Sequence, residues 1–104
     1  MPFKSLKDPS LVKSKCLIDG QWVDADSGQT SAVINPADGS EIARVAFASA
    51  AETQRAIEAA DQAWLTWREE TAEHRGHVLR KWYDLMLAHQ EDLAIILTAE
   101  QGKP

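Results

Sequence analysis

The chain has 104 residues, of which 44% are hydrophobic and 26% are charged, and its formal net charge at pH 7 is −5. This composition excludes wholesale disorder, and the length suits one small domain rather than two. Because phosphate contacts need a clustered basic face, an acidic chain of this kind is not expected to bind nucleic acid.

The basic amino-terminal residues are expected to form a solvated arm rather than a targeting segment. No stretch of the sequence approaches the roughly 20 apolar residues that a membrane-spanning helix needs. The single cysteine, Cys16, excludes an internal disulfide and fits a reducing compartment. Residues 1–14 are interrupted by Pro2 and Pro9, which discourage regular structure. We therefore expect a flexible amino-terminal arm over residues 1–14 and a cytoplasmic protein with no membrane partner.

The first regular structure is predicted over residues 16–23. Asp19-Gly20 separates two short runs of residues that favour strands, and both turn residues tolerate a positive φ. The sequence thus predicts a hairpin with a two-residue turn.

Two further strands are predicted over residues 32–34 and 41–46. Asn35-Pro36 closes the first, and residues 41–46 alternate polar and apolar side chains as a half-buried strand does. The amino-terminal half is therefore predicted to be a small antiparallel β unit.

Helices are predicted from Ser49 onward. Ser49 and Glu52 have the spacing of a capping box, in which each side chain satisfies the other residue's backbone N–H. The first helix is expected to run to about Arg68, and Thr71 is a suitable cap for a second.

A third helix is predicted from about Glu91, ended by Gly102 and Pro104. The sequence leaves open whether the second and third helices form one bent rod. The segment is thus locally α+β, an antiparallel β unit followed by two or three helices.

The helical half carries more apolar surface than its own elements are expected to cover. Two interpretations stay open: the chain is one part of a larger protein, or it is a small independent module whose apolar stripe docks a partner protein or a second copy. The residues concerned are Trp64, Trp67, Val78, Leu79, Trp82, Leu85, Met86, Leu93, Ile96 and Leu97.

Residues with reactive side chains are few. His74 and His77 are three apart on a predicted helix, but zinc sites need three or four positioned ligands, so solvated helix-surface residues are favoured. Cys16 has no visible activating base or cation and is read as an apolar filler. Gly102-Lys103 lacks the preceding glycine and the following hydroxyl residue of a phosphate-binding loop. The tryptophans are read as packing residues rather than as a ligand cage.

Four segments follow one another along the chain: Leu17-Ile18-Asp19-Gly20-Gln21-Trp22-Val23, Ile34-Asn35-Pro36-Ala37-Asp38-Gly39, Ala63-Trp64-Leu65-Thr66-Trp67-Arg68 and Leu97-Thr98-Ala99-Glu100-Gln101-Gly102-Lys103-Pro104. In this order they resemble the amino-terminal start of the aldehyde dehydrogenase superfamily. Within that superfamily, the stretch from residue 89 to the closing Gly-Lys-Pro is most similar to the succinate-semialdehyde dehydrogenases, and glutarate-semialdehyde enzymes are similar here too.

The resemblance implies an α/β parent fold, with residues 15–104 forming the incomplete amino-terminal part of its cofactor-binding domain. It implies NAD- or NADP-dependent oxidation of an aldehyde, with succinate semialdehyde as the expected substrate, by a full-length homo-oligomer. In such enzymes a cysteine thiolate attacks the aldehyde and hydride passes to the nicotinamide. The family's nucleophile, base and nucleotide-binding residues have no counterparts in this chain. Cys16 does not match the nucleophile's motif, so we expect the segment alone to bind no cofactor and to be inactive.

The resemblance implies one further feature within these residues. Some members hold a structural monovalent cation near the end of the Asn-Pro strand. By position its ligands here are the carbonyl of Ile34 and the carboxylate of Glu100, although other members have aspartate in place of Glu100. The remaining ligand lies outside this chain.

Overall fold

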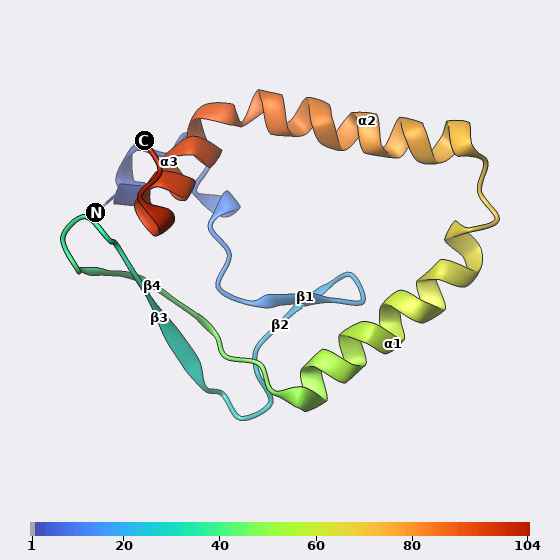
Figure 1. The fold of residues 1–104 in the computed structure, drawn as a ribbon, viewed down its shortest axis with the longest axis horizontal. Helices are drawn as coiled ribbons and strands as arrows, with labels where there is room; N and C mark the ends of the chain where they lie inside the picture. Colours follow the sequence, from blue (N-terminus) through green and yellow to red (C-terminus); the bar gives the residue numbers. More distant parts are fainter. Residues whose placement is uncertain (1) are drawn as a thin grey trace.

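The computed structural model describes residues 2–104 and contains nine short elements joined in an open frame (Figure 1). Two 3-10 turns come first, two strand pairs follow, and three helices end the chain. The elements are η1 (Pro2–Ser5), η2 (Pro9–Leu11), β1 (Cys16–Ile18), β2 (Gln21–Val23), β3 (Thr30–Ile34), β4 (Glu41–Ala46), α1 (Ala50–Trp67), α2 (Ala72–Ala88) and α3 (Gln90–Gln101).

Strands β1 and β2 form the predicted hairpin. They pair antiparallel, with Leu17 opposite Trp22. Asp19 has φ 52° and Gly20 has φ 72°, so both turn residues are left-handed. This is the backbone of a type I′ turn, whose twist matches that of the paired strands, and the prediction from Asp19-Gly20 is confirmed.

Strands β3 and β4 form a second, separate hairpin. Thr30 lies opposite Ala46, and the register shifts between Val33 and Ile34. β4 has the predicted bounds, whereas β3 begins two residues before the predicted strand. Within residues 2–104 the four strands make two two-stranded antiparallel sheets, so the predicted antiparallel β unit is confirmed and consists of two hairpins.

The helix boundaries follow the predicted capping residues. Ser49 and Glu52 form the capping box at the start of α1, and the Thr71 hydroxyl accepts the N–H of His74 at 3.0 Å. Gly102 ends α3 in the left-handed conformation, with φ 82°. The chain bends at His89, with φ −108° and ψ 18°, so α2 and α3 are separate helices.

The arm at the amino end is more regular than predicted. Pro9 stands at the start of η2, where its missing N–H costs no hydrogen bond, and η1 likewise begins at a proline. Leu6, which follows η1, is buried. The irregular backbone predicted here is thus replaced by short 3-10 turns over residues 2–5 and 9–11, whereas residues 6–8 and 12–14 are irregular as predicted. Residue 1 lies outside the described residues, and the arm's flexibility in solution stays a prediction.

The frame is much less compact than a self-contained domain. Its radius of gyration is 16.6 Å, against about 13 Å expected for a globular chain of this length. The hairpins and three helices enclose a loop-shaped outline in Figure 1, with α3 returning close to the arm and to the turn between β3 and β4. Few apolar residues are buried in the part of the chain that the structure describes: Leu6, Ala25, Ile42 and Ala99.

No helix among residues 2–104 is both long and apolar enough to cross a membrane.

Candidate functional site

The turn after β3 meets the end of α3, and this junction brings the two predicted cation ligands onto neighbouring segments. The Asn35 side chain accepts the N–H of Ala37 at 2.9 Å, which fixes the turn. A Cβ atom added to Gly102 would lie 3.0 Å from Cγ of Pro36. Ile34 directly precedes this turn, and Glu100 lies two residues before Gly102.

Both residues that are predicted to supply ligands are exposed at this junction. The Glu100 side chain is exposed, and Ile34 is 46% exposed. One carboxylate and one carbonyl are hard oxygen donors of the kind that group-one and group-two cations prefer, but they are two donors rather than a full coordination shell. Among residues 2–104 no group of three or more His, Cys, Asp or Glu side chains is placed to hold a metal ion.

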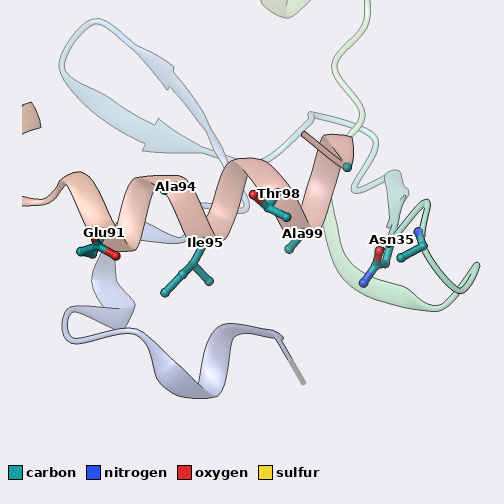
Figure 2. A pocket seen from close by; sticks show the side chains of 8 residues that line it. Asn35, Glu91, Ala94, Ile95, Thr98 and Ala99 are labelled. Atoms are coloured by element: carbon teal, nitrogen blue, oxygen red, sulfur yellow. Dashed lines mark hydrogen bonds between the residues drawn. The ribbon is translucent and has the colours of Figure 1, made fainter. Parts of the chain in front are cut away.

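A shallow groove of about 450 Å³ runs along α3 beside this junction. Figure 2 shows Glu91 and Ile95 along the helix and Asn35 across from its carboxyl-terminal end. Ala94, Thr98 and Ala99 line the rest of the helix side. Because the lining is mostly small and apolar, with Glu91 as the one ionisable side chain among its described residues, the groove is suited to receive packing side chains.

A buried carboxylate, Glu52, joins the start of α1 to the loop after β2. One of its oxygens accepts the N–H of Asp26 at 2.6 Å, and the other accepts the N–H of Ser49 at 2.7 Å together with the Ser49 hydroxyl. Glu52 is 2% exposed. These donors, the Ser49 hydroxyl first, lower the pKa of Glu52 to about 2. The carboxylate therefore stays ionised and holds the loop.

An ion pair strengthens the same joint from outside. The Arg55 guanidinium donates to both carboxylate oxygens of Asp26 at 2.8 Å. This two-bond geometry orients both groups, and the hydrogen bond to Asp26 raises the pKa of Arg55. The sequence predicts the pairing of Ser49 with Glu52, but neither contact with Asp26, since residues so far apart in the chain give no local pattern.

The predicted apolar stripe is in place and is largely uncovered. Trp82 is 62% exposed, Leu79 56% and Trp64 47%. No residue of α2 is buried. Large apolar side chains that recur at helical spacing and stay exposed indicate a place where other polypeptide packs.

The remaining candidate groups show no assembled chemistry among the described residues. His74 lies with its ring edge against Trp67, at 6.5 Å between ring centroids, and its Nε2 is 3.9 Å from a carboxylate oxygen of Glu70. His77 lines a shallow hollow further along α2. Cys16 is half-buried in β1, opposite Val23.

Comparison with known proteins gives a consistent set of matches. Residues 22–104 match the model of the aldehyde dehydrogenase family. The chain is 58% identical over 99 residues to 3-sulfolactaldehyde dehydrogenase of Pseudomonas putida and 54% identical over 99 residues to glutarate-semialdehyde dehydrogenase of Pseudomonas aeruginosa. Each alignment covers 95% of this chain and 20% of the relative.

Solved structures agree with these relatives. Succinate-semialdehyde dehydrogenase from Burkholderia pseudomallei superposes with a TM-score of 0.93 at 52% identity, over 96% of this chain and 21% of that one. A betaine aldehyde dehydrogenase from Staphylococcus aureus, solved with NAD+, superposes with a TM-score of 0.88 at 34% identity, over 98% of this chain and 20% of that one. The chain thus spans about a fifth of the length of the relatives it matches.

Proposed function

This chain belongs to the aldehyde dehydrogenase family, and we propose that it is the amino-terminal part of an NAD- or NADP-dependent semialdehyde dehydrogenase. The observation that carries the proposal is the agreement of sequence and fold over nearly the whole chain with enzymes of that kind. Its own residues form the edge of the cofactor domain, not the reacting centre.

We propose an aldehyde with an anionic group at its far end as the substrate of the whole protein, and succinate semialdehyde as a leading member of that class. The named substrates of the relatives support this class: succinate and glutarate semialdehydes carry a carboxylate, and sulfolactaldehyde carries a sulfonate. None of residues 2–104 forms a recognisable nucleotide site, since no glycine-rich turn opens α1, α2 or α3. No step of the reaction is therefore assigned to this chain.

The contribution of this chain is structural. The uncovered stripe on α1 and α2 and the groove along α3 supply apolar faces for the rest of the domain. The Glu52 joint fixes the start of α1 relative to the loop after β2. We expect the whole protein to be a cytoplasmic homo-oligomer, which gel filtration with light scattering and cell fractionation would test.

The activity is tested on the full natural protein that carries this chain. Reduction of NAD+ and of NADP+ would be followed with succinate semialdehyde, glutarate semialdehyde and 3-sulfolactaldehyde, beside an uncharged aldehyde of matched length. We expect the anionic aldehydes to have a higher kcat/KM than the uncharged control. Equal turnover of the control would overturn the proposed substrate class, and the absence of turnover with every aldehyde would overturn the enzyme assignment.

We also propose that Ile34, through its carbonyl, and Glu100, through its carboxylate, contribute to a structural monovalent-cation site completed by residues elsewhere in the protein. The exposed Glu100 and the proximity of Gly102 to Pro36, whose Cγ would lie 3.0 Å from a Cβ added to Gly102, support this placement. The thermal midpoint of the whole protein should be higher in sodium or potassium chloride than in choline chloride of equal ionic strength. Glu100→Gln should remove that difference, and an unchanged difference in the variant would exclude Glu100 as a ligand.

A further inference from the structure

A buried carboxylate on α3 holds the amino-terminal arm. Asp92 is 3% exposed, and each of its oxygens accepts one backbone N–H from the arm: that of Lys7 at 3.0 Å and that of Asp8 at 2.8 Å. A buried carboxylate is costly unless donors satisfy it. Asp92 also lies in the first turn of α3, where a negative charge is favoured. The Asp92 carboxylate is therefore stabilised both by the N–H groups of the arm and by its position at the start of α3.

Apolar contact accompanies this polar attachment. Leu6, one residue before Lys7, is 8% exposed, and η1 lies against α3 (Figure 1). The attached residues, Lys7 and Asp8, line a hollow with the bend between α2 and α3. The arm thus lies beside the bend at which α2 ends and α3 begins.

The other end of the arm is attached to the β side of the frame. The carbonyl of Ser14 accepts the N–H of Ala46, at the end of β4, at 2.8 Å. The ammonium group of Lys13 lies 5.1 Å from the ring centroid of Trp22. The arm is therefore anchored at both ends, on α3 and on the hairpins.

We propose that residues 3–14 act as a strap, latched by Asp92, that fixes the bend between α2 and α3. By fixing the bend, the strap also sets where the carboxyl end of α3 meets the turn at Pro36. Asp92 is a positioning residue in this arrangement. The proposal depends on contacts within this chain and is independent of the enzyme's substrate.

Hydrogen exchange tests the latch in the full natural protein. Mass spectrometry would follow the peptide that contains Lys7 and Asp8 in the parent and in Asp92→Asn. The matched control is Glu91→Gln, which removes an exposed carboxylate from the same helical turn. We expect exchange at the two amides to be about tenfold faster or more in Asp92→Asn, as loss of a charge-assisted bond implies, and unchanged in the control.

The amide of Asp26, bound by Glu52, is the internal reference for an intact fold. Should Asp92→Asn also expose this amide, Leu6→Ala replaces it as the test variant, with the same expected effect on the arm. Unchanged exchange at Lys7 and Asp8 in the folded variant would overturn the latch. Equal acceleration by Glu91→Gln would also overturn it, because the effect would then be a general weakening of the helix start.

Discussion

The junction between α3 and the turn after β3 allows a prediction that separates backbone strain from side-chain contact. Gly102 has φ 82° and Gly28 has φ 73°, so alanine at either position must adopt a left-handed backbone. The cost of that backbone is about 1–2 kcal/mol per residue. A Cβ at position 28 would meet nothing within 4 Å, whereas one at position 102 would lie 3.0 Å from Cγ of Pro36.

We therefore expect Gly102→Ala to lower the free energy of unfolding by more than Gly28→Ala does. The strain is common to both variants, so an excess of about 1 kcal/mol or more, as overpacking costs, measures the contact with Pro36. Denaturant titration of the parent and both variants supplies the two differences.

The double variant Pro36→Ala/Gly102→Ala completes the experiment, because it removes the atom that the new Cβ would meet. The double variant should regain the additional loss of stability that the contact with Pro36 causes, but not the loss caused by the left-handed backbone of alanine. Equal losses of unfolding free energy in Gly102→Ala and Gly28→Ala would refute the reasoning, because the added Cβ at position 102 would then cause no steric clash with Pro36.

Three other substitutions give independent checks. Glu52→Gln should remove the part of the unfolding free energy that depends on ionised Glu52. Because the folded pKa of about 2 lies below the ordinary 4.5, this contribution is complete above pH about 4.5 and is lost as pH falls toward about 2. The unfolding free energy of the variant should therefore vary less with pH across that window. Trp82→Ala should cost within about 0.5 kcal/mol in the isolated chain, where the ring is 62% exposed, but about 3–5 kcal/mol in the whole protein if the stripe is covered there; equal small losses in both would contradict the proposed packing. Gly76→Ala, in the interior of α2 with open space at its Cβ, should raise the stability of the isolated chain by about 0.5–1 kcal/mol. A lower thermal midpoint in the variant would contradict the open space at this position.

The features predicted from sequence are those set by neighbouring residues. Asp19-Gly20 fixes its hairpin because both residues accept a positive φ, and Ser49 with Glu52 fixes the start of α1 because the two caps lie one helical turn apart. The positions of Thr71 and Gly102 bound the other helices for the same reason. Short-range chemistry is enough for such features.

The features missed are contacts between distant segments. The N–H of Asp26 on Glu52, and those of Lys7 and Asp8 on Asp92, are backbone donors, which every residue except proline offers alike. No sequence pattern therefore marks them. Separation of the strands into two hairpins has the same origin, because pairing between hairpins depends on tertiary arrangement.

The apolar period predicts a surface that other polypeptide covers, and the structure shows its large side chains exposed on the helices. The periodicity does not identify the polypeptide that packs on this face, because any apolar surface of suitable shape could do so. Trp82 and Leu79 are accordingly exposed in this chain. Assignment to a family of longer enzymes supplies the proposed partner that periodicity lacks.

The two-stranded sheets have a consequence for the newly synthesised protein. Each strand has a ladder partner on one side only among the described residues, so its other backbone edge is open to a further strand. A nascent polypeptide that has left the ribosome to about this point would present such edges beside bare tryptophans, a combination that invites mispairing between neighbouring chains. If the chain is part of a longer enzyme, as proposed, chaperone capture is expected to be strongest at this stage of translation and to weaken once further residues cover these edges.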